Sequence, residues 1–518
     1  MRNKTGVKYL LLALACLCAS IGVALPFHYP SLFLLSWCGM VPWLWVIHHS
    51  TVKQAYWFGL LFGAVLFFLT TYWVNGFLTQ INPDAPFRNG LLSTGYWLYV
   101  AHIPALLAMC TRWLSLTRSI NSCVSFPLLG TLLFFFAPTV FPIEFSSSQI
   151  NFTIALQATN LTGSIGLHWL ILLCNSLLYQ WLISGNNRQR STEYQGWLLM
   201  TCWFLYGYIQ LNSSQSLDTR LRIGLVQPNY PPSIAVAKPE QGYSNEFSPE
   251  LEISQLLARQ GAEIIIWPEL RHTGFYQLPE VKNSIQQFLE NNDVALWIQD
   301  LKENDGKIYN VSLLLENSGI RSEYYKQLRI PFGETLPFSD VPMVGTFLIN
   351  IFSGFHTPIA TQPQHNAFWF KGISMQAFIC YEVSNARFIN AYLRKKQKRP
   401  ALLIFQSNNS WFGNSIQPAL HRATGILRSV EQGLPGIHVI NNGPSTITSP
   451  HGKILFTSAR DVRRGYLIDV AFTQQPSATF FSRYPHVFIS FIMLMTLMYS
   501  MKYFRPAGYG SAPTPTDG

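Results

Sequence analysis

The sequence predicts a multi-pass α-helical membrane domain of about eight spans, joined to an α/β domain that lies outside the cytoplasm. Two observations predict this fold class. Only 12% of the 518 residues are charged and 49% are hydrophobic, whereas ordinary globular domains are about 25% charged. Long apolar runs fill the N-terminal part of the chain, and a more polar stretch with alternating strand and helix patterns follows them.

Eight apolar runs are long enough to cross a bilayer, whose hydrocarbon core needs roughly 20 apolar residues per helix. They cover approximately residues 8–26, 30–48, 54–74, 90–114, 121–143, 160–183, 194–211 and 485–503. The first run follows Arg2, Lys4 and Lys8 and has the length of a signal peptide. We interpret it as an uncleaved span, because no small-x-small cleavage site leads into a polar mature start and the next apolar run follows almost at once.

The distribution of Lys and Arg in the short loops predicts the orientation of the spans. Most of these residues fall on one side: Arg2, Lys4, Lys8, Lys53, Arg112, Arg118, Arg188, Arg190, Lys502 and Arg505. The short loops of the other side carry essentially Arg88. Because positively charged loops stay in the cytoplasm, we expect both termini in the cytoplasm and the α/β domain outside. The net charge of +11 is thereby explained by topology, and we expect no nucleic-acid partner.

The chain divides into a seven-helix domain (1–215), an α/β domain (219–473), a C-terminal helix (485–503) and a disordered tail (506–518). Short β-rich runs bounded by turn residues predict strands at 223–229, 263–270, 294–301, 309–316, 373–382, 401–409, 436–442, 445–450 and 452–458. Apolar residues at helical spacing followed by Gly predict helices at 249–261 and 418–433. Alternating strands and helices indicate helices packed on sheets.

Cys380 is the one cysteine in the polar part of the chain. The other seven lie within or at the edge of long apolar segments, so Cys380 has no nearby sulfur for a disulfide or a CxxC metal site. It ends an apolar, strand-like run and precedes Tyr381 and Glu382. A cysteine at the end of a buried strand is in general more often a small hydrophobic residue than a nucleophile, so its neighbours in the fold decide its role.

Two residues of the same domain are suited to make this cysteine a catalyst. A thiol performs acyl transfer as a thiolate and needs a base or a positive charge beside it. Glu269 ends a predicted buried strand, and Lys326 lies in a loop rich in turn residues. A carboxylate, an amine and a thiol at such positions form a base, an oxyanion stabiliser and a nucleophile.

These residues lie in motifs that resemble the Glu-Lys-Cys triad of the carbon-nitrogen hydrolase (nitrilase) superfamily. The motifs follow in family order: IIIWPEL at 264–270, YYKQLRIPFGETLP at 324–337, FICYE at 378–382, SNNSWFG at 407–413, His421, RSVEQG at 428–433 and NNG at 441–443. Seven spans before this domain and one after it resemble the apolipoprotein N-acyltransferase family of Gram-negative inner membranes, a membrane branch of the superfamily. The resemblance covers nearly the whole chain and implies a nitrilase-like αββα sandwich for the α/β domain.

The resemblance also implies roles for individual residues. Glu269 would be the general base, Lys326 the oxyanion stabiliser, aided by a backbone amide near Tyr381, and Cys380 the nucleophile. Glu334 of the PFGE motif would orient the lysine.

Tyr381 and Glu382, which follow the nucleophile, are expected to support catalysis. We expect no cofactor and no metal ion.

The reaction implied by the family has two steps. A phospholipid donates an acyl chain to the cysteine, and the N-terminal amine of a diacylglyceryl-modified lipoprotein then takes it. The expected partners are therefore phospholipid, lipoprotein and membrane lipids, and the chain would act as a monomer in the inner membrane with its catalytic domain in the periplasm. The loops at 75–90 and 141–153 mix aromatic and polar residues, which suits either a lipid entrance or ordinary interfacial anchoring.

The sequence departs from the family pattern at three places. Val236 stands where the family has a tryptophan, Asn409 and Asn414 stand where it has acids, and QLR follows the lysine. These departures leave two alternatives open. One is a membrane-tethered amidase or hydrolase of the superfamily, and the other is a non-catalytic homologue in a secretion or conjugation apparatus.

Overall fold

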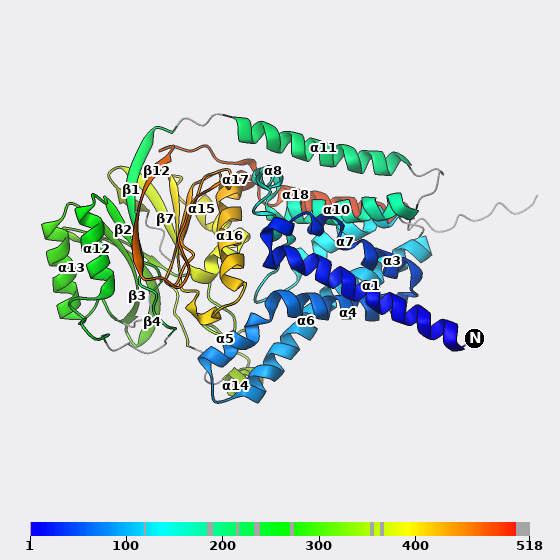
Figure 1. Cartoon of the computed structure of the whole chain (residues 1–518), viewed down its shortest axis with the longest axis horizontal. Helices are drawn as coiled ribbons and strands as arrows, with labels where there is room; N and C mark the ends of the chain where they lie inside the picture. The colour runs from blue at the N-terminus through cyan, green and yellow to red at the C-terminus, as the bar shows by residue number, and fades with distance from the viewer. Residues whose placement is uncertain are drawn as a thin grey trace, which may run out of the picture.

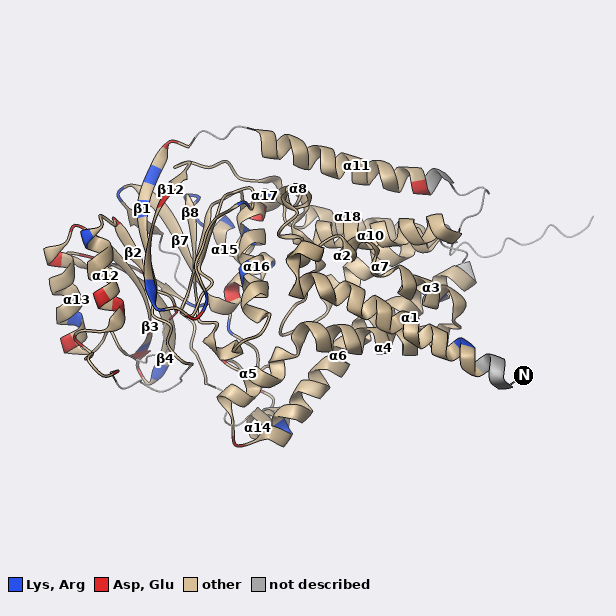
Figure 2. Cartoon of the chain, in the orientation of Figure 1, with Lys and Arg blue, Asp and Glu red and all other residues tan. Residues whose placement is uncertain are grey.

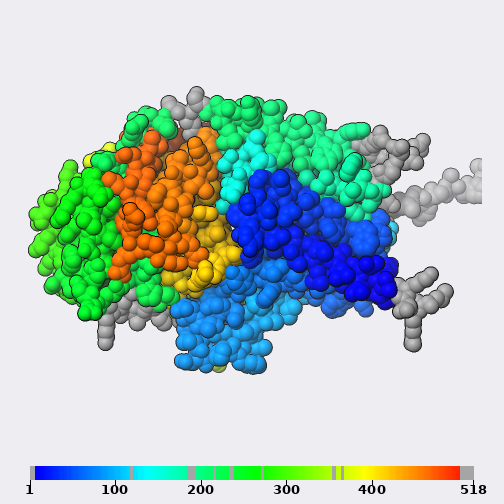
Figure 3. Space-filling view, in the orientation of Figure 1, coloured from blue at the N-terminus to red at the C-terminus, as the bar shows by residue number. Residues whose placement is uncertain are grey.

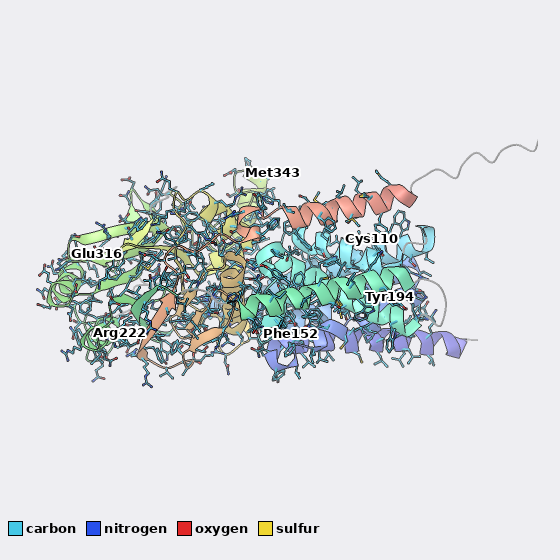
Figure 4. The ribbon with its side chains drawn as sticks, turned by 90° about the horizontal axis from the view of Figure 1, so that it is seen from above. Cys110, Phe152, Tyr194, Arg222, Glu316 and Met343 are labelled. Carbon is cyan, nitrogen blue, oxygen red and sulfur yellow. The ribbon has the colours of Figure 1, made fainter. Side chains whose placement is uncertain are left out.

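The computed structural model describes residues 2–118, 121–183, 190–213, 217–232, 239–269, 274–352, 357–362 and 367–503. The molecule is elongated, with a helical part at one end and an α/β part at the other (Figure 1). The two parts pack directly against each other (Figure 3). Figure 4 labels Arg222 and Glu316 in the α/β part, Cys110 and Tyr194 in the helical part, and Phe152 near their junction.

The helical part contains the first eleven helices and the last one. Its α-helices are α1 (Arg2–His28), α2 (Leu35–Cys38), α3 (Val41–His49), α4 (Val52–Thr71), α5 (Trp73–Ile81), α6 (Pro86–Arg118), α7 (Ser122–Phe136), α8 (Thr153–Leu156), α9 (Thr159–Thr162), α10 (Ser164–Ile183), α11 (Arg190–Asn212) and α18 (Val487–Tyr503), with 3₁₀ turns η1 (Pro30–Leu32) and η2 (Phe145–Gln149). Charged residues are sparse there and concentrate in the α/β part (Figure 2). This distribution fits a protein whose helical part lies in a membrane.

Four helices within the described ranges are long and apolar enough to cross a membrane: Gly6–His28, Val52–Thr71, Pro86–Leu116 and Ser164–Ile183. Helices α7 and α18 are apolar but shorter. The predicted count of eight spans therefore stays a prediction.

The expectation of a continuous helix over 30–48 is wrong. This segment forms η1, α2 and α3, separated near Gly39. A Cβ on Gly39 would lie 2.7 Å from the Leu35 carbonyl oxygen and 3.1 Å from the Gly22 carbonyl carbon of α1. Pro42 follows in the first turn of α3, where proline is tolerated because its missing N–H has no intrahelical partner.

Two other predicted spans end early. The run 121–143 is helical only as far as Phe136, because Pro138 has no N–H with which to donate the next helical hydrogen bond. The run 54–74 ends at Thr71, after which α5 occupies much of the predicted loop at 75–90.

The α/β part contains two six-stranded sheets. The first has the order β12-β1-β2-β3-β4-β5 and the second β11-β10-β9-β8-β7-β6. Their strands are β1 (Thr219–Gln227), β2 (Ile264–Ile266), β3 (Ala295–Asn304), β4 (Lys307–Glu316), β5 (Gly319–Tyr325), β6 (Phe368–Phe370), β7 (Ile373–Ile379), β8 (Leu402–Ser407), β9 (Gly436–Ile440), β10 (Thr446–Thr448), β11 (Ile454–Thr457) and β12 (Arg464–Phe472). All nine predicted strands are confirmed, and β5, β6 and β12 are additional.

Helices cover the outer face of each sheet, as an αββα sandwich requires. One apolar core, which includes Ile223, Trp297 and Phe378, joins the inner faces of both sheets. Helices α12 (Pro249–Arg259) and α13 (Pro279–Asn291) pack on the first sheet. Helices α15 (Ala386–Arg394) and α16 (Gln417–Gln432) lie between the second sheet and the helical part (Figure 1). The predicted nitrilase-like fold class is confirmed.

Helix α16 joins the two parts of the molecule. Its residues Ala423, Ile426, Leu427 and Val430 belong to the same apolar core as the helices of the N-terminal part. Short α17 (Phe480–Arg483) then leads into α18. The second sheet, whose strand β7 ends directly before Cys380, is therefore the one nearest the helical part.

Helix α14 (Pro342–Phe352) is an apolar helix that the sequence analysis did not predict. Met343 on it is 87% exposed, and Phe347 is also exposed. The predicted disordered tail at 506–518 lies outside the described residues.

Candidate active site

Cys380 follows directly after strand β7 and opens the 3₁₀ turn η3 (Cys380–Ser384). Its backbone φ is 50°, a left-handed conformation that is uncommon for a residue with a Cβ. Strained backbone of this kind concentrates at functional sites. The strand before it is buried at every position, whereas Cys380 itself is partly exposed.

The buried carboxylate of Glu382 holds this turn in place. Its Oε2 accepts a hydrogen bond from the Ile379 amide at 2.8 Å. Its Oε1 accepts from the Gln327 and Leu328 amides at 2.7 and 3.0 Å and from the Tyr324 hydroxyl at 2.8 Å. Burial raises the pKa of Glu382 to about 7, although the hydrogen bonds oppose the shift. Glu382 thus ties the cysteine turn to the loop after β5.

Glu269 lies just beyond β2, and its two carboxylate oxygens have separate partners. Oε1 accepts from the side-chain amide of Asn310 at 3.0 Å, and Oε2 accepts from the Asn408 backbone amide at 3.2 Å. The Cys380 thiol lies beside this carboxylate, and each group shifts the pKa of the other. Burial raises the pKa of Glu269, which makes it a better proton acceptor than an exposed glutamate.

Lys326 lies at the end of β5 and is only 1% exposed. Its Nζ donates to Glu334 Oε1 at 2.6 Å, and its backbone amide donates to the Asn310 carbonyl at 2.8 Å. Burial by itself would lower the pKa of Lys326, but the negative charges of Glu334 and Glu269 outweigh it and raise the pKa. The ammonium group therefore stays charged.

Glu334 is itself anchored, since its Oε2 accepts from the Ile330 amide at 2.9 Å. The lysine thus has a positioned carboxylate partner.

The pKa of the Cys380 thiol is raised, first by burial and then by the neighbouring Glu269, while Lys326 acts in the opposite direction. The sulfur is consequently a thiol at rest and not a preformed thiolate. It needs a base at the moment of attack, and the Glu269 carboxylate is the neighbouring proton acceptor.

Tyr381 points away from this cluster toward the helical part. Its hydroxyl donates to the Val140 carbonyl at 2.6 Å, in the segment between α7 and η2. The two residues that follow Cys380 in this turn are therefore held by different partners: Glu382 by the lysine loop and Tyr381 by the helical part.

His421 of α16 supports the same turn. Its Nε2 lies 3.2 Å from the Cys380 carbonyl oxygen and its Nδ1 2.8 Å from Asn409 Oδ1. Burial lowers the pKa of His421 to about 4. Asn409, one of the departures from the family pattern, is thus fully buried beside the site, whereas Asn414 is exposed.

Val236, the third departure, lies outside the described residues.

The sequence analysis missed the contribution of Asn310 in β4. This side chain is buried, donates to Glu269 and accepts from Gln299 Nε2 at 2.8 Å. A polar amide in an otherwise apolar buried strand was the available signal, because a buried amide needs hydrogen-bond partners.

The site contains no candidate metal centre. In the part of the chain that the structure describes, no group of three or more His, Cys, Asp and Glu side chains is arranged to hold a metal ion.

Two family models match this chain. The carbon-nitrogen hydrolase model matches residues 223–469, and the model of the apolipoprotein N-acyltransferase N-terminal domain matches residues 19–177. The chain belongs to the apolipoprotein N-acyltransferase family. The two models match the chain in the same order as the two parts of the structure: the N-terminal-domain model matches within the helical part, and the carbon-nitrogen hydrolase model matches the α/β part.

Curated relatives named apolipoprotein N-acyltransferase are similar to much of the chain. That of Pasteurella multocida is 25% identical over 88% of both chains, and that of Photobacterium profundum is 26% identical over 83% of both. For that of Rickettsia prowazekii the identity is 24%, and the alignment covers 60% of this chain but only 61% of the relative.

Among solved structures, the α/β part is similar to Saccharomyces cerevisiae Nit3, a member of branch 10 of the nitrilase superfamily. The sequence identity is 15%, the TM-score is 0.36, and the match covers 53% of this chain and 97% of that protein.

Proposed function

We propose that this chain is an apolipoprotein N-acyltransferase. It transfers an acyl chain from a phospholipid, through a thioester on Cys380, to the α-amine of the N-terminal S-diacylglyceryl cysteine of a lipoprotein. The observation that carries this proposal is the cluster of Glu269, Lys326 and Cys380, which come from three separate segments and meet beside a helical part suited to a membrane. Curated relatives with this name support the choice of substrates.

In the first half-reaction, the Cys380 sulfur attacks an ester carbonyl of the phospholipid while Glu269 accepts the thiol proton. The Lys326 ammonium donates to the developing oxyanion together with the backbone amide of Tyr381, and one such donor contributes about 3–4 kcal/mol to the transition state. The ester C–O bond then breaks, and Glu269 returns the proton to the leaving lysophospholipid oxygen. A thioester on Cys380 remains.

In the second half-reaction, the lipoprotein amine attacks the thioester carbonyl. Glu269 accepts a proton from the attacking nitrogen, an amide C–N bond forms, and the C–S bond breaks. The proton passes from Glu269 to the departing sulfur and restores the thiol. No cofactor is required, because the acyl group is already activated as an ester.

The supporting residues position these groups. Glu334 keeps Lys326 charged and oriented through the 2.6 Å contact. Glu382 holds the cysteine turn against the lysine loop, and Tyr381 fixes the same turn to the helical part. These three residues are positioning residues in the proposed mechanism.

The proposed location is the bacterial inner membrane, with the catalytic domain (219–473) in the periplasm and both termini in the cytoplasm. Both substrates are anchored in the membrane by acyl chains, so a site next to the spanning helices reduces their search to lateral diffusion. The excess of Lys and Arg in alternate loops supports this orientation.

The test is the formation of the acyl-enzyme. Purified protein incubated with phospholipid should gain the mass of one acyl chain, and hydroxylamine should remove it. Cys380→Ala or Cys380→Ser should abolish the adduct and lower transfer to a lipoprotein acceptor at least about 10³-fold. The matched control is Cys202→Ser, which changes an exposed thiol of α11 and should leave the adduct unchanged.

Two results would contradict the proposal. An undiminished adduct on the Cys380→Ala variant would exclude the thioester. An adduct that water removes at the same rate with and without acceptor would favour the hydrolase alternative.

A further inference from the structure

A cavity of about 350 Å³ lies between the helical part and helix α15, on the side of the cysteine turn that Tyr381 faces. This volume falls within the range of about 300–1,000 Å³ that is typical of small-molecule sites. Its lining includes residues from both parts of the molecule, among them Phe135 of α7, Glu144, Tyr381, Arg387 and Arg394 of α15, and His486 before α18.

The lining changes in chemistry from one wall to the other. The wall formed by the helical part is largely aromatic and aliphatic, with His168 and Glu144 among its polar residues, whereas the wall formed by α15 carries Arg387 and Arg394. Glu144 is the acidic residue of the lining, and it already contacts Arg428 at 3.5 Å. The cavity therefore combines an apolar wall with a positively charged wall.

The two arginines are placed on the cavity face by the helical repeat. Positions 387, 391 and 394 are four and three residues apart, so they share one face of α15. Ala391 between the arginines is small and leaves space for a ligand. The Arg387 guanidinium lies 4.6 Å from the centre of the Phe135 ring, a cation–π contact that holds it at the edge of the apolar wall. Within the described ranges, neither arginine forms an ion pair.

The cavity lies where the apolar helices end. Helix α7 stops at Phe136, and α18 starts at Val487, directly after the lining residue His486. With the helical part in a membrane, as proposed above, a phospholipid of the adjoining leaflet would have its phosphate near the ends of these helices and its acyl chains beside them. Anionic phosphate beside arginine and hydrocarbon beside phenylalanine match the two walls.

We propose that this cavity binds the phosphate of the glycerophospholipid acyl donor through Arg387 and Arg394. Guanidinium groups bind phosphate oxygens in bidentate fashion, and two of them on one helix face hold a lipid headgroup at a fixed depth. Tyr381 lines the same cavity and directly follows Cys380 in the chain, so the cavity borders the turn that carries the proposed nucleophile. The identification of the bound lipid as the acyl donor rests on the proposed function, whereas the phosphate site itself does not.

The experiment measures lipid binding separately from catalysis. Full-length Cys380→Ser protein in detergent is titrated with phosphatidylglycerol, and bound lipid is counted by native mass spectrometry. The Arg387→Gln/Arg394→Gln variant should bind at least ~10-fold more weakly. Its binding of diacylglycerol with the same chains, which lacks phosphate, should be unchanged.

The matched control is Lys395→Gln/Lys398→Gln. This variant also loses two positive charges, but from exposed positions next to α15 that do not line the cavity. It should bind phosphatidylglycerol as the parent does. Retaining charge with Arg387→Lys/Arg394→Lys should restore part of the affinity, because lysine lacks the bidentate geometry.

With Cys380 intact, the arginine variant should raise the apparent KM for phospholipid by a similar ~10-fold, while the rate of thioester formation at saturation and the KM for lipoprotein stay within about twofold. Unchanged phosphatidylglycerol binding, or equal weakening by the lysine control, would overturn the phosphate site. Weaker binding with an unchanged KM would overturn its role as the donor site. If instead the parent protein forms no adduct while binding still depends on the arginines, the proposed function fails and the phosphate site stands.

Discussion

Two largely buried clusters among the described residues each combine one cation with two carboxylates, and we propose different roles for them. The Cys380 cluster consists of Glu269, Lys326, Glu334 and Cys380. The Arg428 cluster consists of Glu144, Ser164, Arg428 and Glu431. In the second cluster, Arg428 Nε lies 2.9 Å from Glu431 Oε2 with both side chains fully buried, and Arg428 Nη2 lies 3.5 Å from Glu144 Oε2.

The Arg428 cluster connects the two parts of the molecule. Arg428 and Glu431 belong to α16, whereas Glu144 precedes η2 and Ser164 starts α10 in the helical part. The Ser164 amide donates to Glu431 Oε1 at 2.7 Å. The cluster contains no thiol. Its charged side chains connect α16 to the helical part.

The Cys380 cluster differs because its charges surround a reactive group. Its members follow strands of both sheets, and Glu334 is partly exposed, so a substrate has access. Similar electrostatics therefore do not indicate similar roles. What distinguishes a catalytic cluster is a nucleophile, a neighbouring proton acceptor and an open side.

The largest expected effect is on catalysis when the cation of the first cluster is removed. Lys326→Met should lower acyl transfer by about 10²–10³-fold, because the oxyanion loses its charged donor. Folding should be largely kept, since Glu334 can turn to solvent and Glu269 can take up a proton. Single-turnover thioester formation and thermal unfolding in detergent measure the two quantities.

The same change in the second cluster should have the opposite outcome. Arg428→Met should lower the free energy of unfolding by about 3–5 kcal/mol, because it leaves Glu431 buried without its cation. The turnover of the molecules that remain folded should be close to that of the parent. Chemical denaturation, with activity normalised to the folded fraction, provides the measurement.

Glu144→Gln is the milder control for this cluster. Because Glu144 is 25% exposed, this substitution should lower the free energy of unfolding by only about 1 kcal/mol. If Arg428→Met abolished thioester formation in fully folded protein, or if Lys326→Met mainly unfolded it, the distinction between the two clusters would be wrong.

The smallest expected effect is a pH dependence that comes from His421. Burial lowers the pKa of His421 from 6.5 to about 4, so the folded state binds fewer protons than the unfolded state between these values. Its stability contribution is present above the unfolded pKa and is lost as the pH falls below it. Between pH 7 and 5.5 the free energy of unfolding should decrease by about 1 kcal/mol.

His421→Gln should reduce this slope, as measured by denaturation at a series of pH values. A residual slope is expected, because burial also lowers the pKa of the neighbouring His438. An identical slope in the variant and the parent would show that His421 is not the titrating group.

The strands and the helix 418–433 could be predicted because local signals agree there with the fold. β2, β7 and β8 are short apolar runs that end in polar motifs, and a strand buried on both faces produces that pattern. Strand β12 was missed. The burial of its side chains is irregular along Arg464–Phe472, so the sequence shows no clear alternation of apolar and polar residues there.

The segment 30–48 shows the limit for the helical part. Its composition is that of a continuous span, but Gly39 lies against Gly22 of α1, and that approach is made between segments distant in sequence. Hydropathy measures the solvent that a segment prefers and does not measure such contacts.

The sequence by itself determined the family and the two kinds of domain, and it pointed to Glu269, Lys326 and Cys380 as the candidate catalytic residues, because these depend on residue type and order along the chain. The tertiary structure alone decided that Asn310 holds Glu269, that Glu382 and Tyr381 anchor the nucleophile turn in opposite directions, and that two arginines of α15 face an apolar cavity. The physical reason is that hydrogen bonds and cavities depend on distances between segments far apart in the chain, which only folding brings together.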